Sequence, residues 1–147
     1  MQLLPTCLAD CFVIKPSVFT DNRGYFFESF NELTFGKLAG FPVHFVQDNQ
    51  SYSKYGVLRG LHFQIGEHAQ AKLVQVVKGE VLDVAVDLRP ESPTYGKHTS
   101  IRLSEENKTM LFIPRGFAHG FVVLSKEAVF QYKCDNFYHK ESESGIH

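Results

Sequence analysis

Charged and imidazole side chains interrupt several apolar runs of this 147-residue sequence. Arg59 and His62 lie within the run Val57–Phe63, and Lys72 begins the run Lys72–Val77. Other polar residues in such runs are Asp83, His119 and Tyr132. Inside a small β-structure these groups are costly unless they are paired or meet a polar ligand. They predict a cavity that is open at one end, binds an anionic, hydroxylated ligand and holds an imidazole suited to proton transfer.

Each of these residues also has a structural explanation when it is taken alone. His62 and His119 fit core histidines that are hydrogen-bonded to the backbone. Lys72 and Arg59 fit long side chains that reach a solvent-exposed rim, and Tyr132 fits a core aromatic residue. The structural explanation must hold on every strand at once, so we favour the cavity, although the residue set alone does not identify the reaction.

Short apolar runs separated by turn residues are the main pattern between Val43 and Cys134. In the run Val81–Leu88, aliphatic residues alternate with Asp83, Ala85 and Asp87, as in a strand with two different faces. Strands this short and regular predict an antiparallel sandwich or barrel. The predicted strands are His44–Gln47, Val57–Phe63, Lys72–Val77, Val81–Leu88, Thr99–Leu103, Met110–Ile113, Gly120–Leu124 and Ala128–Cys134.

Three local features complete the predicted architecture. Strict alternation places Arg59 on the strand face of Leu61 and Phe63, and His62 on the opposite face. One short helix is predicted over Asn31–Leu38, with Asn31 as its N-terminal cap. The polar ending His139–His147 is expected to be poorly anchored.

The overall composition excludes several classes of protein. A net charge of −1 provides no general attraction to nucleic acid or to an anionic membrane. No apolar stretch reaches the roughly 20 residues that a membrane span needs, and the N-terminal residues do not resemble a signal peptide. Three cysteines suit free thiols in the cytoplasm better than a disulfide framework. The length fits one domain over residues 1–147.

The run Pro114–His119 has the form P-x-G-x-x-H, which resembles the second motif of the cupin superfamily. Metal-binding cupins pair this motif with an earlier H-x-H and an acidic ligand. Here the earlier place reads His62-Phe-Gln64, and Lys72 stands near the position of the acidic ligand. Since an ammonium group repels a metal cation, no metal is predicted.

An ordered set of motifs covers nearly the whole chain and closely resembles the dTDP-4-dehydrorhamnose 3,5-epimerase family. The motifs are Val18–Gly24, Gln47–Ser51, Gly56–His62, Ala71–Val74, Gly79–Asp87 and Ile113–Phe121. The resemblance implies an all-β, cupin-type jelly roll (a double-stranded β-helix), no cofactor and a homodimer. It also implies conversion of dTDP-4-dehydro-6-deoxyglucose to dTDP-4-dehydro-L-rhamnose, a precursor of cell-surface polysaccharide.

The resemblance also assigns roles to individual residues. His62 is similar to the family's general base, Tyr132 to its proton donor on the opposite sugar face, and Lys72 to the group that stabilises an enolate. The residues similar to substrate contacts are Arg23, Glu28, Gln47, Asp48, Asn49, Arg59, His119, Tyr138 and Glu143. Among them, Arg23 and Glu28 are expected to reach the site of the other subunit through an exchanged N-terminal segment.

The family normally continues into a tryptophan–aspartate segment, whereas this sequence ends at Gly145-Ile-His147. That segment supplies the carboxylate that hydrogen-bonds the catalytic histidine, so Asp83 is predicted as a substitute partner of His62. Two alternatives stay open: a 3- or 5-monoepimerase on a related dTDP-sugar, and a cupin that binds a dTDP-sugar without turnover. A sugar-nucleotide ketoisomerase is disfavoured because its histidine-pair motif is absent.

Overall fold

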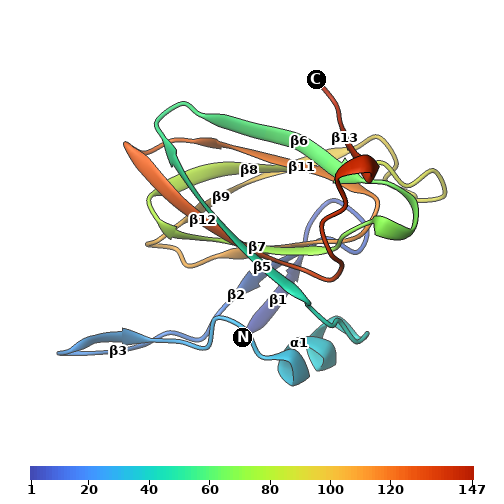
Figure 1. Cartoon of the computed structure of the whole chain (residues 1–147). Helices are drawn as coiled ribbons and strands as arrows, with labels where there is room; N and C mark the ends of the chain where they lie inside the picture. The colour runs from blue at the N-terminus through green and yellow to red at the C-terminus, as the bar shows by residue number, and fades with distance from the viewer.

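Two antiparallel sheets pack face to face in the computed structural model, which describes all residues from 1 to 147 (Figure 1). The first sheet has the strand order β1-β2-β10-β7-β12-β5, and the second has the order β13-β6-β11-β8-β9. Strands β3 and β4 form a separate hairpin that projects from one end of the molecule (Figure 1). The first sheet consists of β1 (Gln2–Pro5), β2 (Phe12–Lys15), β10 (Met110–Ile113), β7 (Lys72–Lys78), β12 (Glu127–Cys134) and β5 (Gln47–Lys54). The second sheet and the hairpin consist of β13 (Glu143–Gly145), β6 (Leu58–Gln64), β11 (Phe117–Val123), β8 (Glu80–Asp87), β9 (His98–Ser104), β3 (Phe19–Asp21) and β4 (Gly24–Phe26).

The two layers have the arrangement of a cupin-type jelly roll, which confirms the predicted all-β fold class. Every predicted strand except the first overlaps most of an observed strand. The first was wrong: the strand is Gln47–Lys54 rather than His44–Gln47. Nearly every residue of β5 is polar, so no apolar run marks this strand in the sequence.

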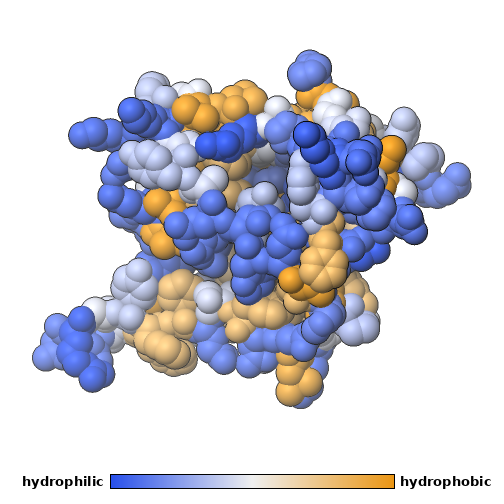
Figure 2. Space-filling view, in the orientation of Figure 1, coloured by the Kyte–Doolittle hydropathy of each residue, from blue (hydrophilic) through white to orange (hydrophobic).

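The predicted helix is confirmed as α1 (Glu32–Ala39), with the side chain of Asn31 accepting a hydrogen bond from the Thr34 amide. The helix ends at Gly40, whose positive φ of 81° suits a residue without a Cβ. Phe35 anchors the helix in a second, smaller core beneath the first sheet. Apolar residues also gather on the lower surface around α1 and at the base of the β3–β4 hairpin (Figure 2), where Phe26 and Leu33 are exposed. No helix in the structure has the length and apolar character needed to cross a membrane.

Strand β8 places Asp83 and Asp87 inside the sandwich, on the same strand face as the buried Val81 and Ala85. Asp83 and Asp87 are fully buried, whereas Leu82, Val84 and Val86 are only partly buried. Because an unpaired buried carboxylate is strongly unfavourable, each of these two must find a partner inside the fold.

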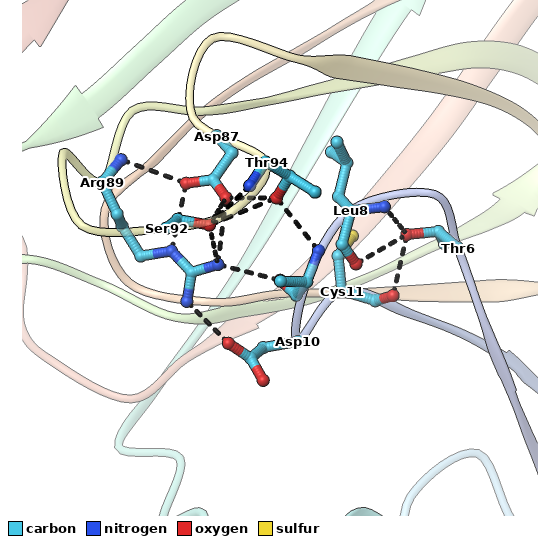
Figure 3. Close-up of polar contacts among 9 residues, drawn as sticks. Thr6, Leu8, Asp10, Cys11, Asp87, Arg89, Ser92 and Thr94 are labelled. Carbon is cyan, nitrogen blue, oxygen red and sulfur yellow. Dashed lines mark hydrogen bonds and ion pairs between the residues drawn. The ribbon is translucent and has the colours of Figure 1, made fainter.

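Asp87 satisfies this need at one end of the sandwich (Figure 3). Arg89 donates to its carboxylate from Nε and Nη2 at 3.0 Å each, and the hydroxyls of Ser92 and Thr94 donate at 2.5 and 2.7 Å. The Arg89 guanidinium also bonds Asp10, at 2.8 Å. The network therefore ties the β1–β2 loop and the loop after β8 to the end of the second sheet.

A β-bulge interrupts the pairing of β6 with β11. His62 pairs with His119 and Arg59 with Phe121, so three steps along β6 match two steps along β11. The extra residue corrects the prediction from strict alternation, because Arg59 and His62 line the same cavity. At the bulge Gly60 has a φ of +116°, and a Cβ there would lie 2.6 Å from the Cα of Gly120.

The chain ending corrects another prediction, since it is anchored. After the 3₁₀-helix η2 (Lys140–Ser142), β13 pairs with β6, and Gly145 lies opposite His62. The backbone amide of Ile146 then donates to the carbonyl of Leu61 at 3.1 Å. Polar side chains do not prevent this docking, because backbone groups make the bonds.

Substitution of Gly60 by alanine should destabilise the fold by more than about 3 kcal/mol, because the new methyl group meets backbone atoms of His119 and Gly120 on β11. Gly56→Ala is the matched control: its φ is also positive at 76°, but no atom lies within 4 Å of the added Cβ. The control should lose only about 1 kcal/mol of backbone strain. Urea unfolding of both variants checks this, and equal losses would contradict the close-contact explanation.

The Asp87 network predicts a pH dependence of stability. Burial alone would raise the pKa of Asp87, but hydrogen bonds from Arg89, Ser92 and Thr94 hold this pKa well below its ordinary value of 3.8. The stabilisation is therefore complete above about pH 5 and is lost as the pH falls below about 4. Asp87→Asn should lower the free energy of unfolding at pH 7 by about 3 kcal/mol and make its decline toward acid pH shallower.

Urea unfolding at a series of pH values measures both effects. Glu80→Gln is the control, because the Glu80–Arg102 ion pair lies near the surface and such pairs contribute at most about 1 kcal/mol. A decline toward acid pH that is equally steep with and without Asp87 would refute the assignment.

Candidate active site

A cavity of about 420 Å³ opens between the two sheets. The residues predicted from sequence that line it are Arg59, His62, Lys72, His119 and Tyr132. Arg59 and His62 come from β6 and His119 from β11, in the second sheet, whereas Lys72 and Tyr132 come from β7 and β12, in the first. The cavity therefore has two polar walls, and each wall is carried by a different sheet.

The imidazole of His62 is exposed to the cavity and forms no ion pair. Its strand is held on both sides, by His119 of β11 and by Gly145 of β13. A ring that is free of protein partners but open to a cavity can accept a proton from a bound molecule.

Asp83 does not pair with His62, which corrects the prediction from sequence. Its carboxylate oxygens lie 2.8 and 3.0 Å from Nε2 of His119 instead. Burial raises the pKa of the Asp83 carboxyl, while His119 and Lys72 act in the opposite direction. Asp83 therefore lies behind His119, where it fixes the orientation of that imidazole and does not line the cavity.

Lys72 and Tyr132 form the facing wall. The Lys72 ammonium lies 5.5 Å from the centroid of the Tyr132 ring. Burial lowers the pKa of Lys72, and the negative charges of Asp83 and Glu143 oppose that shift. Burial also raises the pKa of Tyr132, so its phenol keeps the proton at neutral pH and can donate it.

Two phenylalanines complete the cavity and were not predicted from sequence. Phe121 and Phe130 stack with ring centroids 4.2 Å apart, and Phe130 also stacks on His119 at 6.0 Å. Each stands two positions from a predicted site residue, Phe121 after His119 and Phe130 before Tyr132. Period-two alternation places such residues on the same strand face, which is the sequence signal that could have identified them.

Strand β5 contributes alternate residues to the interior. Gln47 and Asn49 point inward and are joined by a 3.1 Å hydrogen bond between their side chains. Asp48 lies on the outer face of the first sheet, where it forms an ion pair with Lys133 at 3.0 Å. Alternation thus directs Asp48 away from the cavity of its own chain.

Other predicted substrate contacts lie outside the cavity lining. Tyr138 and Glu143, near the C-terminus, are joined by a 2.7 Å bond from the phenol to the carboxylate. Arg23 lies in the projecting hairpin, bonded to Asp21, and Glu28 bonds the cap residue Asn31. Arg23 and Glu28 are exposed and do not reach the cavity of their own chain.

The donor set around the cavity is unlike that of a metal centre. No three His, Cys, Asp or Glu side chains converge closely enough to hold an ion. Cys134, which approaches Asn49, is buried, and burial raises the pKa of its thiol to about 11, so it stays protonated. A metal-free reaction stays a prediction from the residue types.

Comparisons with known proteins extend this picture. Residues 5–147 match the family model described as dTDP-4-dehydrorhamnose 3,5-epimerase. The curated enzyme of that name from Escherichia coli K12 is 55% identical over 146 residues, which cover 99% of this chain and 79% of the enzyme. The crystal structure of dTDP-4-dehydrorhamnose 3,5-epimerase from Elizabethkingia anophelis is 62% identical, with a TM-score of 0.96, over 99% of this chain and 80% of that one.

A Legionella pneumophila dTDP-6-deoxy-D-glucose-3,5-epimerase, solved in complex with dTDP-4-keto-L-rhamnose, is 50% identical with a TM-score of 0.95. The match covers 99% of this chain and 77% of that structure. Sequence and fold thus agree over nearly the whole chain. The chain belongs to the dTDP-4-dehydrorhamnose 3,5-epimerase family.

Proposed function

We propose that this chain epimerises a dTDP-linked 4-keto-6-deoxyhexose at carbons 3 and 5, converting dTDP-4-dehydro-6-deoxyglucose to dTDP-4-dehydro-L-rhamnose for rhamnose biosynthesis. One cupin-type domain over residues 1–147 carries the reaction. The observation that supports it most directly is the placement of His62 and Tyr132 on opposite walls of one cavity, with Lys72 beside Tyr132. Membership of the family, with relatives of that name above 50% identity, supports the same substrate.

The chemistry follows from the ketone at carbon 4. Carbons 3 and 5 are both next to it, so removal of a proton from either one gives an enolate. His62 takes that proton, and the Lys72 ammonium stabilises the negative charge on oxygen 4, where one such donor contributes about 3–4 kcal/mol. Tyr132 returns a proton to the opposite face of the carbon, which inverts the centre. Proton exchange with water then restores neutral His62 and the Tyr132 phenol.

The remaining polar groups suit the nucleotide. Arg59 lies at the edge of the cavity, where its guanidinium donates to the Ser53 hydroxyl at 2.9 Å and can meet a diphosphate. His119, held by Asp83, offers its other ring nitrogen to the same ligand. We assign Tyr138 to stacking on the thymine ring and Glu143 to a further substrate contact.

His62→Ala should reduce the exchange of deuterium from heavy water into carbons 3 and 5 by about 10²- to 10⁴-fold, the contribution of a positioned general base. Affinity for dTDP, measured by calorimetry, should stay nearly unchanged. Exchange at only one carbon in the starting protein would identify a monoepimerase. Exchange at neither carbon would leave a dTDP-sugar-binding cupin, which the free imidazole of His62, without a carboxylate partner, would then explain.

Tyr132→Phe provides the companion measurement, because it removes the phenol hydroxyl and little else. Proton loss to His62 should continue, while formation of the inverted product should fall. If product formation were unchanged, Tyr132 would have no part in the reaction.

We further propose a homodimer that exchanges its N-terminal segment. The β3–β4 hairpin projects from the molecule with Phe19 and Phe26 exposed, and it carries Arg23 away from the cavity of its own chain. Burial of these aromatic residues against a second copy would remove apolar surface from water and bring Arg23 to the partner's site. All three cysteines are free, which suits a reducing, cytoplasmic compartment.

The dimer predicts complementation between inactive variants. Arg23→Ala should weaken dTDP binding, and His62→Ala should reduce isotope exchange by about 10²- to 10⁴-fold, as above. When the two variants are mixed and allowed to exchange subunits, each mixed dimer holds one site with both residues intact, so isotope exchange should reappear. No recovery in a mixture that sediments as a dimer would contradict the shared site.

A further inference from the structure

Gln64 is a buried polar residue that the reaction described above does not use. It lies on β6, two positions after His62, and the residue is only 6% exposed. Its carboxamide forms three hydrogen bonds, all to backbone groups of other segments. Nε2 donates to the carbonyl of His68 at 2.6 Å and to that of Phe137 at 3.2 Å, and Oε1 accepts from the His139 amide at 2.9 Å.

The bonds to Phe137 and His139 fall on either side of Tyr138. The amide of Tyr138 itself donates to Oε1 of Gln47 at 3.0 Å, so the backbone around this residue is fixed at three consecutive positions. The Tyr138 phenol in turn holds Glu143, and Glu143 is the register partner of Gln64 where β13 pairs with β6. In Figure 1 this C-terminal segment, in red, lies beside the green segment that follows β6.

Ring stacking also joins the segment that follows β6 to the C-terminal segment. His68, at the end of the 3₁₀-helix η1 (Gly66–His68), stacks on His139 with centroids 3.7 Å apart and planes within 1°. The side-chain amide of Asn136 donates to the carbonyls of Glu67 and Ala69 at 2.9 and 3.3 Å. Gln64 lies on the inner side of this junction and connects it directly to the strand of His62.

We propose that Gln64 is a positioning residue for substrate recognition. It fixes the backbone around Tyr138 so that the Tyr138 ring and the Glu143 carboxylate are presented to the nucleotide in a constant position relative to His62. The inference rests on the proposed function, because Tyr138 and Glu143 act here as substrate contacts. Tyr138 is 55% exposed and Phe137 63% exposed, so side-chain packing does little to order this segment. Because the segment is already ordered before the substrate binds, binding does not have to meet the entropic cost of ordering it, and the affinity is higher.

Gln64→Met removes the carboxamide and keeps a side chain of similar length. The value of KM, and the Kd for dTDP, should rise about tenfold, because a buried hydrogen-bonding group and its partners are left unpaired. The rate of isotope exchange at saturating substrate should stay within about twofold, because His62, Lys72 and Tyr132 are not displaced. Gln70→Met is the matched control: its Nε2 donates a single bond, to the Asn136 carbonyl at 2.9 Å, and takes no part in the three hydrogen bonds at positions 137–139.

Gln64→Glu separates positioning from general stability. The introduced carboxylate still accepts from the His139 amide but repels the carbonyls of His68 and Phe137. When this carboxyl is protonated it donates again. The ratio of the variant's Kd for dTDP to the wild-type Kd, measured at the same pH, should therefore fall toward one as the pH falls. A ratio that does not change with pH would overturn the proposal.

Amide hydrogen exchange of residues 137–146 tests Gln64 independently of catalysis. Protection of this segment should fall in Gln64→Met and stay near wild type in Gln70→Met. Unchanged amide protection in Gln64→Met would overturn the proposal. So would a lower rate of isotope exchange into the substrate at saturation with KM unchanged, or a loss of protection in Gln70→Met equal to that in Gln64→Met. If the wild-type chain exchanged no deuterium at carbons 3 and 5, the proposed function would fail, whereas amide protection and dTDP affinity would still decide the role of Gln64.

Discussion

Two fully buried carboxylates on one strand govern the arrangement of this sandwich. Asp83 and Asp87 face the interior from β8, and neither can be ionised there without a partner. Asp87 recruits Arg89 and two hydroxyls, and this network closes one end of the fold with a loop from each sheet. Asp83 recruits His119 and leaves the neighbouring His62 free. Strand β8 thus has Asp87 at the end of the sandwich that the Arg89 network closes, and Asp83 behind the open cavity that holds His62.

The two histidines of the cavity show how position distinguishes identical side chains. They are register partners on adjacent strands. His119 is 93% buried and held by a carboxylate, which suits a fixed donor to a ligand, whereas His62 is open to the cavity and unpaired. Sequence motifs identified both residues as part of the site. Only the cross-strand geometry shows which of the two is held by Asp83.

The sequence predictions succeeded where the signal lies in residues close together along the chain, and they failed where the structure depends on contacts between distant segments. Apolar runs located most strands and Asn31 located the helix, because these signals depend on residues close in sequence. Strand β5 was missed because its residues are almost all polar, and the docking of β13 was missed because backbone groups make it. The bulge at Gly60 and the Asp83–His119 pair depend on contacts between strands. No local pattern within β6 or β8 encodes them.

His62 and Tyr132, the proposed general base and acid, belong to different sheets, so the gap between them is a property of the whole sandwich. Stacked sheets lie about 10 Å apart, and the side chains between them set that spacing. Core residues such as Leu111 and Val74 therefore set the spacing of the two cavity walls, although these two do not border the cavity. A change of core volume would shift one wall against the other, and the stereochemical outcome of the reaction would become sensitive to packing far from the sugar.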